Sequence, residues 1–398
     1  MRDRTRRTIV ALTTSFPLRP SDWAGIFIQR LYAQLDGTHV NVVCPADDRT
    51  SELLEPAHVA VHAARYAPRR WQSLAQRSGG VVPGLKKHPW RILLLPGLLL
   101  SMVYSAWRLG RRGDLVHANW AVCGALASVV ASLLRIPLVT TLRGDDVKRA
   151  VASRVDRWLL SLACQRSEAV ICVSDAMASG LRARFPSLAG KVHVVRNGVD
   201  DSFLATEHVP RAAGTPMRIG AVGSLIHRKG FDVLINAIHE MRDRNVSLSV
   251  IGAGPEQGSL QALTARLGLQ DRVTFLGEIP PPSMPAFLAS VDLFVLSSRS
   301  EGRPNVVIEA LAAGVPVVST DLPGVAGLVV DGVGWIVPVD DAPALASALD
   351  VACSDPAHLL VMGQLARLRA AADGGWRRAA GEYDAIFDSV IRDYRRKH

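Results

Sequence analysis

Two runs of alternating segments constrain the fold of this chain more than any other feature. Between residues 8 and 200, short apolar runs such as 8–16, 39–45 and 136–142 alternate with stretches that have the period of a helix. The same alternation restarts at residue 217 and continues to residue 320. Strands that alternate with helices are typical of a parallel sheet covered by helices on both faces. The sequence therefore predicts an α/β protein with two doubly wound, Rossmann-like halves.

A segment of low order separates the two runs, and 398 residues are too many for one ordinary core. We expect an N-terminal domain over residues 1–205, a linker over 206–216, a second domain over 217–375 and an amphipathic C-terminal helix over 376–398. Ligands of open α/β sheets bind beyond the carboxyl ends of the strands. We therefore expect both domains to face a central cleft.

Charge is distributed unevenly along the chain. Residues 1–205 contain 28 Lys and Arg against 15 Asp and Glu, whereas residues 206–398 contain 18 against 21. A basic N-terminal half indicates an anionic partner such as nucleic acid, anionic lipid or a phosphate-bearing substrate, or else a solvated basic surface. No nucleic-acid recognition element is present in the sequence, so nucleic acid is the least favoured partner.

The longest apolar run, residues 92–107, has 16 residues and contains Pro96 and Gly97, which is shorter than a spanning helix requires. Arginines and the indoles of Trp71, Trp90 and Trp107 flank it. This arrangement predicts either an interfacial helix on an anionic membrane or a core helix beside a loop.

The five cysteines are widely spaced, without a Cys-x-x-Cys pair, and are expected to be small core residues in a reducing compartment. The N-terminus has too few apolar residues for a signal peptide. We expect a cytoplasmic protein, peripheral on the inner face of the cytoplasmic membrane if the apolar run is interfacial.

The stretch from Ser297 to Val318 contains the strongest indication of a ligand site. Glu301 and Glu309 lie eight positions apart around a Gly-x-Pro-Asn turn between two apolar runs. Pro304 suits the first turn of a helix, and Ser298 or Ser300 could cap it. A helix N-terminus favours phosphate, so we expect one there. Glu309, about one and a half turns further on, could then accept hydrogen bonds from sugar hydroxyls.

A second loop follows the first strand of the C-terminal half. It runs from Gly223 through Ser224 to the adjacent cations Arg228 and Lys229, which suit an anion. Because both loops follow strands of one domain, cations for a diphosphate and carboxylates for sugars can converge, which indicates a nucleotide-sugar. The glycines of 252–258 match the dinucleotide fingerprint poorly, and no Walker P-loop occurs, so we interpret 252–258 as a tight turn.

These segments resemble the retaining glycosyltransferases of family 4, which have the GT-B fold. The resemblance covers nearly the whole chain, through TSFPLRPSDWAGIFIQRL, VHANWAVCG, LVTTLRGDDV, AVICVSDAM, VVRNGVD, VGSLIHRKGFDVLI, VIGAGPE and SEGRPNVVIEALAAGVPVVSTDLPG. The last segment has the E-x7-E spacing of the family. The resemblance implies a metal-independent, cofactor-free hexosyltransferase. It would move a sugar from a UDP- or GDP-sugar to a hydroxyl of a glycan or lipid-linked acceptor in polysaccharide or glycolipid synthesis.

The same resemblance implies roles for individual residues. Glu301 would face the transferred sugar, Glu309 would hold the ribose, and Lys229 with Arg228 would stabilise charge on the leaving diphosphate. The implied donor-binding set is Gly25, Gly223, Ser224, Arg228, Lys229, Pro304, Asn305, Val306 and Glu309. Gly25 would let the first-domain loop approach the diphosphate, and the C-terminal helix would return to the first domain.

Two positions depart from the family pattern. Ser224 stands where many members have an arginine, and Arg143 stands where many have a histidine. Arginine cannot act as a general base at neutral pH. We expect Arg143, oriented by Asp145, to bind a phosphate of the acceptor or hydroxyls of the donor sugar. His117 is the nearest other histidine candidate, although a histidine at a strand end is more often structural.

Two further functions are compatible with the same residues. One is a nucleotide-sugar epimerase or a sugar-phosphate synthase. The other is a non-catalytic partner protein that binds a nucleotide-sugar, which the two departures would explain.

Overall fold

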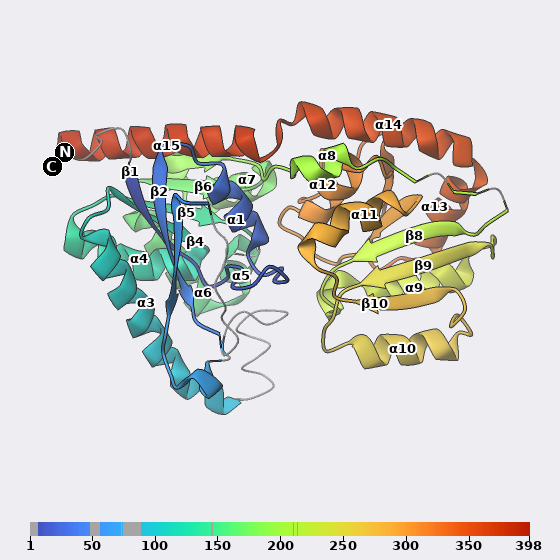
Figure 1. Cartoon of the computed structure of the whole chain (residues 1–398), viewed down its shortest axis with the longest axis horizontal. Coiled ribbons are helices and arrows are strands. Elements are labelled where there is room, and N and C mark those ends of the chain that lie inside the picture. The colour runs from blue at the N-terminus through green and yellow to red at the C-terminus, as the bar shows by residue number, and fades with distance from the viewer. Residues whose placement is uncertain are drawn as a thin grey trace. The chain divides into compact units, whose positions relative to one another are not determined.

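The computed structural model describes the chain over residues 7–47, 56–72, 74, 89–144, 146–209, 211–212 and 214–398. The chain forms two compact units (Figure 1). The first comprises Met1–Asn197 together with Trp376–His398, and the second comprises Gly198–Gly375. Each unit contains one parallel sheet, as the alternation of strands and helices predicts.

The first unit contains a seven-stranded parallel sheet in the order β3-β2-β1-β4-β5-β6-β7. The strands β4, β5 and β6 are buried along their whole length, as expected for the interior of a sheet covered on both faces, whereas the edge strands β3 and β7 are partly exposed. The strands are β1 (Arg7–Leu12), β2 (Thr38–Pro45), β3 (Val59–Ala64), β4 (Leu115–Asn119), β5 (Leu138–Leu142), β6 (Ala169–Cys172) and β7 (Val192–Val194).

Helices cover both faces of this sheet (Figure 1). One face packs against α1 (Ile26–Ala33) and α15 (Gly375–Lys397), whose Tyr383 and Phe387 are fully buried. The predicted return of the C-terminal helix to the first domain is therefore confirmed. The other face packs against α3 (Leu95–Gly110), α4 (Ala121–Leu134), α5 (Asp146–Ala152), α6 (Arg154–Arg166) and α7 (Asp175–Arg184). The described part of this unit also contains the 3-10 turns η1 (Arg69–Trp71), η2 (Pro89–Leu94) and η3 (Pro186–Lys191).

The second unit contains a six-stranded parallel sheet in the order β10-β9-β8-β11-β12-β13. The strands are β8 (Met217–Val222), β9 (Val246–Ile251), β10 (Val273–Gly277), β11 (Leu293–Leu296), β12 (Val317–Thr320) and β13 (Gly334–Val337). The order reverses direction at β8, so right-handed crossovers place the helices before and after this point on opposite faces. Ligands of such sheets bind at this switch point, beyond the ends of β8 and β11.

The helices of the second unit pack in two groups. On one face α9 packs with α10 and α13, and on the other α12 packs with α8, α11 and α14. Their bounds are α8 (Asp201–Ala205), α9 (Phe231–Glu240), α10 (Gln257–Arg266), α11 (Met284–Ala289), α12 (Asn305–Ala312), α13 (Ala342–Ser354) and α14 (Pro356–Ala372), with 3-10 turns η4 (His227–Lys229) and η5 (Pro281–Ser283).

The apolar run forms a longer helix than the sequence indicated. Trp90–Gly110 is one helical stretch of 21 residues, which by length and composition alone is enough to cross a membrane. Its Leu98, Met102 and Ala106 are buried on the sheet of the first unit. The helix is longer than predicted because the 3-10 turn η2 continues directly into α3.

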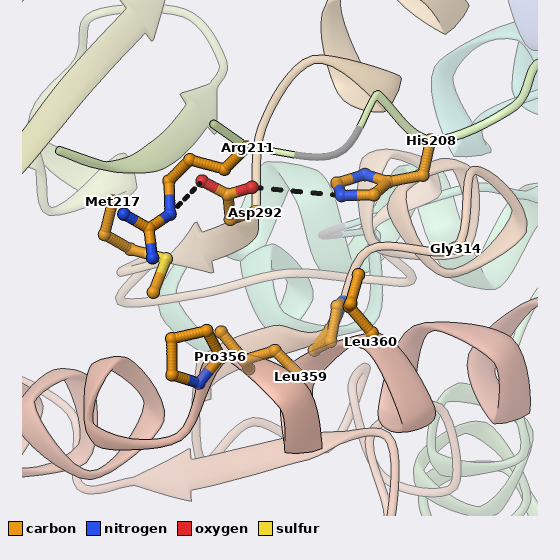
Figure 2. A pocket seen from close by; sticks show the side chains of 9 residues that line it. His208, Arg211, Met217, Asp292, Gly314, Pro356, Leu359 and Leu360 are labelled. Carbon is orange, nitrogen blue, oxygen red and sulfur yellow. Dashed lines mark ion pairs between the residues drawn. The ribbon is translucent and has the colours of Figure 1, made fainter. Parts of the chain in front are cut away.

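The predicted linker is attached to the amino edge of the second sheet. Asp292, which directly precedes β11, is 8% exposed and pairs with Arg218 at 2.6 Å. Figure 2 shows Asp292 between His208 and Arg211 of the linker, at 3.8 and 3.9 Å. Burial lowers the pKa of His208, an effect that Asp292 partly opposes. His208, Arg211 and Asp292 line a cavity of about 100 Å³. The other residues that line it are Met217, Gly314, Pro316, Pro356, Leu359 and Leu360.

All five cysteines are buried and free, as predicted for small core residues. Burial raises the pKa of the Cys44 thiol to about 12, so this thiol stays protonated and unreactive at neutral pH.

Candidate functional site

The loops after β8 and β11 meet at the carboxyl end of the second sheet. Lys229 Nζ donates a hydrogen bond to Glu301 Oε1 at 2.6 Å, and Ser298 Oγ donates to the same oxygen at 2.8 Å. The Arg228 guanidinium lies 3.7 Å from Glu301 Oε2. Because β8 and β11 are adjacent strands, residues far apart in the sequence form one charged cluster here.

Glu301 is ionised in this cluster. The residue is 8% exposed, and burial alone would raise its pKa. The charges of Lys229 and Arg228, with hydrogen bonds from Lys229 and Ser298, outweigh burial and hold the pKa of Glu301 below its usual value. A buried carboxylate of this kind can accept hydrogen bonds from sugar hydroxyls at neutral pH.

Backbone contacts hold the two loops together. Ser297 Oγ donates to the Lys229 carbonyl at 3.0 Å, and the Arg299 N–H donates to the Arg228 carbonyl at 2.8 Å. Gly230 has φ of 64°, and a Cβ at this position would lie 2.1 Å from the Ser297 carbonyl oxygen. Only glycine allows this approach, so Gly230 lets the cationic loop contact the acidic one.

A neighbouring arginine reinforces this junction. Arg299 contacts Asp232 through two hydrogen bonds, at 3.0 and 2.7 Å, and contacts Asp340 at 2.6 Å. The Arg299 pairing lowers the pKa of Asp232 against the opposing effect of burial. Arg299 thus connects the β11 loop to α9, whose first turn contains Asp232.

The predicted helix start lies beside this cluster. Pro304 is the residue preceding α12, and no side chain caps this helix among the residues the structure describes. The suggested capping role of Ser298 or Ser300 is therefore wrong; the Ser298 hydroxyl bonds Glu301 instead. The first-turn residues Asn305 and Val306 are half-buried at the uncapped end, where backbone N–H groups favour an anion. Glu309 is 6% exposed in the middle of α12.

Two of the remaining predicted donor residues lie in the loop after β8. Gly223 follows the strand directly, and a Cβ there would lie 3.2 Å from Cε of Lys229. Ser224 is the next residue, and its carbonyl accepts a backbone hydrogen bond from Ile226. The glycines of 252–254 approach this loop from β9: a Cβ at Gly252 would lie 1.9 Å from the Gly223 carbonyl oxygen. Close packing between two loops thus accounts for this glycine.

Arg143 lies in a buried polar cluster of the first unit. Its Nε donates to Asn119 Oδ1 at 2.6 Å and its Nη1 to Asn197 Oδ1 at 3.3 Å. Its guanidinium carbon lies 5.2 Å from the centre of the Phe27 ring. The predicted partner Asp145 lies outside the described residues. The Asp146 carboxylate holds this loop by accepting the Arg143 N–H at 3.1 Å.

The structure corrects the expectation that His117 contacts a ligand. His117 is fully buried, and its ring nitrogens are hydrogen-bonded to Tyr32 and Thr141, each at 2.8 Å. The rings of Tyr383 and Phe387 from α15 pack against it. Burial, with the nearby Arg143 charge, lowers the pKa of His117 well below its usual value. His117 is a neutral core residue because α1 and α15 cover this face of the sheet.

Gly25 directly precedes α1 in the first unit. It has φ of 77°, and a Cβ there would lie 2.3 Å from the Ser15 carbonyl oxygen. Backbone packing alone therefore requires glycine at this position, and its predicted approach to a diphosphate stays a prediction. Among the described residues, no group of three or more His, Cys, Asp and Glu side chains could hold a metal ion.

Comparison with known proteins assigns the chain to a family. The model of Glycosyltransferase Family 4 matches residues 26–203, and that of Glycosyl transferases group 1 matches residues 216–355. The putative colanic acid biosynthesis glycosyltransferase WcaL of Escherichia coli K12 is 30% identical over 69% of this chain and 72% of its own. The chain belongs to the family 4 glycosyltransferases. It is therefore a glycosyltransferase, and the resemblance seen in its motifs is confirmed.

Two further relatives match a larger part of this family 4 glycosyltransferase than WcaL does. The GDP-mannose-dependent alpha-(1-6)-phosphatidylinositol monomannoside mannosyltransferase of Mycolicibacterium smegmatis is 32% identical, over 82% of this chain and 89% of its own. The lipopolysaccharide core biosynthesis mannosyltransferase LpcC of Rhizobium leguminosarum bv. viciae is 29% identical, over 76% and 86%.

Solved structures share the fold over nearly the whole glycosyltransferase. Sucrose-phosphate synthase from Thermosynechococcus elongatus matches with a TM-score of 0.80 at 22% identity, over 97% of this chain and 100% of that one. HepE from Anabaena, solved with UDP-glucose, matches with a TM-score of 0.77 at 22% identity, over 96% and 99%. At such identities the likeness shows the fold alone, which is GT-B with two Rossmann-like domains.

Several residues of these clusters did not stand out in the sequence. Ser298 was interpreted as a helix cap, whereas it bonds the catalytic candidate Glu301. Asn119 and Asn197 are polar residues at or just after the ends of strands β4 and β7, and that position is the signal that could have revealed them.

Proposed function

We propose that this family 4 enzyme transfers a sugar from a UDP- or GDP-sugar to a hydroxyl acceptor with retention of configuration. The observation that carries the proposal is the pairing of Lys229 and Arg228 with the buried Glu301 at the carboxyl end of the second sheet. Cations suit a leaving diphosphate, and an ionised acid suits the hydroxyls of the sugar.

The diphosphate would bind at the uncapped start of α12. The backbone N–H groups of Asn305 and Val306 face that end, and the helix dipole adds positive charge there. Glu309, further along the same helix, would accept hydrogen bonds from the ribose hydroxyls. Gly223 and Ser224 follow the adjacent strand β8, where the loop backbone would border the phosphates.

In the transfer step, the bond between the anomeric carbon and the diphosphate oxygen breaks. The acceptor oxygen bonds to the same carbon from the same face, and its proton passes to the departing phosphate oxygen. Lys229 and Arg228 would stabilise the negative charge that develops on that oxygen, in place of a metal ion. Glu301 would hold the sugar and keep Lys229 oriented, since the two side chains are already hydrogen-bonded.

We also propose a lipid-linked acceptor and a peripheral position on an anionic membrane, on the inner face of the cytoplasmic membrane. The N-terminal part of the 90–110 helix presents large apolar side chains to solvent: Trp90 is 51% exposed, Ile92 57%, Leu93 78%, Leu100 70% and Tyr104 60%. Several large, exposed apolar side chains on one helix favour a membrane or protein partner.

Cations accompany this patch. The guanidinium of Arg91 lies 5.8 Å from the Trp90 ring, and that of Arg70 lies 5.4 Å from the Trp71 ring. Indoles and arginines around exposed aliphatic side chains suit the interface of an anionic bilayer. Two relatives act, by their names, on a phosphatidylinositol monomannoside and on lipopolysaccharide core, which supports an acceptor in glycolipid or polysaccharide synthesis.

A donor screen followed by product analysis tests the proposal. UDP-, GDP- and ADP-sugars are added to the purified protein, and a rise in Tm identifies the donor. Lipid and glycan extracts are then supplied as acceptors, and NMR of the product reports the anomeric configuration. Conversion of the donor without any acceptor would indicate an epimerase. Donor binding without transfer to any acceptor would indicate a non-catalytic partner, and an inverted product would refute retention.

A further inference from the structure

The guanidinium of Arg143 is buried, and no described residue supplies a counter-charge to it. The residue is 8% exposed, and its two side-chain hydrogen-bond acceptors are the neutral amide oxygens of Asn119 and Asn197. Its third nitrogen, Nη2, is buried and has no hydrogen-bond partner. Within the described ranges, no Asp or Glu oxygen forms an ion pair with this side chain. A buried cation that lacks an anion is unfavourable, so this arrangement indicates that a counter-ion is supplied from outside.

The carboxylate closest in sequence among the described residues is already engaged. Asp146 Oδ1 accepts the Ala121 N–H at 3.0 Å, and its Oδ2 accepts the N–H groups of Arg143 and Gly144 at 3.1 and 3.4 Å. These contacts fix the backbone of the loop. They do not neutralise the guanidinium, because the carboxylate bonds main-chain groups.

The Arg143 side chain is held in place before any ligand binds. Asn119 is fully buried and donates through Nδ2 to the Tyr32 hydroxyl at 3.0 Å, which directs its oxygen to the arginine. Phe27 lies against the guanidinium and packs edge-on against Trp120, with ring centres 6.2 Å apart. Trp120 has φ of 70°, a strained backbone of a kind that clusters at ligand sites.

The cluster lies where ligands bind in such sheets. Asn119 is the last residue of β4, Arg143 directly follows β5, and Asn197 follows β7. Phe27 is in the first turn of α1, which follows β1. All four strands are parallel, so their carboxyl ends share one edge of the sheet.

We propose that Arg143 is the recognition residue for an anionic group, a phosphate or a carboxylate, on the acceptor. This inference rests on the proposed function, and it adds that the first domain receives the acceptor. An anion would give Nη2 a charge-assisted hydrogen bond and would neutralise the buried cation at the same time. A sugar hydroxyl would supply the hydrogen bond but not the charge, so the acceptor is an acidic glycan or a phosphate-linked lipid.

Anion binding to the full chain tests this assignment. The donor site is first filled with saturating UDP or GDP, whichever raises the Tm, so that inorganic phosphate cannot bind there. Inorganic phosphate and glucuronate are then titrated at constant ionic strength, with the Tm as readout. Arg143→Gln is compared with Arg166→Gln, which removes the same charge from an exposed position of the first unit.

Arg143→Gln should weaken anion binding by about tenfold or more, the loss expected for one charge-assisted hydrogen bond, while Arg166→Gln binds like the wild type. Stronger binding of phosphate indicates a phosphate-bearing acceptor, and stronger binding of glucuronate an acidic sugar. Equal binding by wild type and Arg143→Gln, or no anion binding by the wild type, overturns the proposal. Arg143→Lys retains the positive charge but lacks the planar guanidinium. It replaces Arg143→Gln in the anion titration if the glutamine variant does not fold. Failure of every nucleotide to bind would instead refute the proposed function.

Discussion

Lys229 and Glu301 are 72 positions apart in the sequence, yet the ammonium of one donates to the carboxylate of the other at 2.6 Å. Both side chains are largely buried, with 15% and 9% of their side-chain surface exposed. The pair joins the loop after β8 to the loop after β11, so the cation that we propose for the phosphates and the acid that we propose for the sugar share one hydrogen bond. Their mutual contact also fixes the orientation of each side chain.

Replacing Glu301 with alanine should reduce the rate of sugar transfer by about 10²-fold or more, because it removes the acid that we propose to contact the sugar and leaves Lys229 without the carboxylate that orients it. The variant should remain folded but less stable, since two cations lose their carboxylate. Initial rates with the identified donor and circular dichroism provide the two measurements. Glu240→Ala, at an exposed position at the end of α9 in the same unit, is the matched control. Wild-type activity in Glu301→Ala would refute the assignment of the site.

The ionised Glu301 should make stability depend on pH. Its pKa is lowered in the folded state, so its stabilising contribution is complete above the unfolded pKa of about 4.3 and is lost as the pH falls through the lower, folded value. The difference in unfolding free energy between wild type and Glu301→Gln should therefore be largest above about pH 5 and should shrink at lower pH. Urea unfolding at a series of pH values measures it. A difference that stays constant between pH 6 and 3 would contradict the ion pair.

Asp292 should matter for stability and not for catalysis. It pairs with Arg218 and lies near His208 and Arg211, at the amino edge of the sheet, whereas Glu301 follows the carboxyl end of β11. Asp292→Asn should lower the unfolding free energy by about 1–3 kcal/mol, because Arg218 is left without its charged partner. The activity of the folded fraction should remain at the wild-type level. A fall in kcat without a change in stability would show that this cluster has a different role.

Membrane binding should depend on the exposed apolar side chains at the start of the 90–110 helix. A variant with both Leu93→Asp and Leu100→Asp should bind vesicles that contain phosphatidylglycerol at least about 10²-fold more weakly, since each leucine contributes about 1.5–3 kcal/mol when fully buried. Binding should also weaken as salt increases. Leu368→Asp is the control, because Leu368 is 69% exposed on α14 of the other unit. Vesicle co-sedimentation that is unchanged in the double variant would refute this surface as the contact.

Chelation should leave the transfer reaction intact. We propose that Lys229 and Arg228 neutralise the diphosphate in place of a metal ion, and we therefore expect EDTA to change the initial rate by less than about twofold. Activity that disappears with EDTA and returns with Mg²⁺ or Mn²⁺ would show that a metal takes part. The replacement Lys229→Gln should then be tested with and without the metal.

The sequence predicted the donor-side loops better than the first-unit cluster, for a physical reason. The acids of the 297–318 stretch and the cations of the 223–229 loop follow strands of one sheet, so strand alternation alone predicts their common edge. The burial of His117 was not predictable in this way, because it depends on Tyr383 and Phe387 of a helix more than 260 positions away. The capping role of Ser298 was also wrong, since a hydroxyl beside a buried carboxylate bonds the charge in preference to a helix end.

The sequence by itself determined the two parallel sheets and the residue types at the ends of β8 and β11. The predicted end of the first domain at residue 205 differs from the structure, in which the second unit begins at Gly198 because α8 packs on α12. The period of each segment, and the alternation of strands with helices along the chain, depend on residues that are neighbours in the sequence. The tertiary structure alone decided that Lys229 pairs with Glu301, that linker residues attach to Asp292, and that Arg143 is buried among amides with no anionic partner in the part of the chain that the structure describes. Those contacts depend on which long-range segments pack together and on how much solvent they exclude, and no local pattern encodes either.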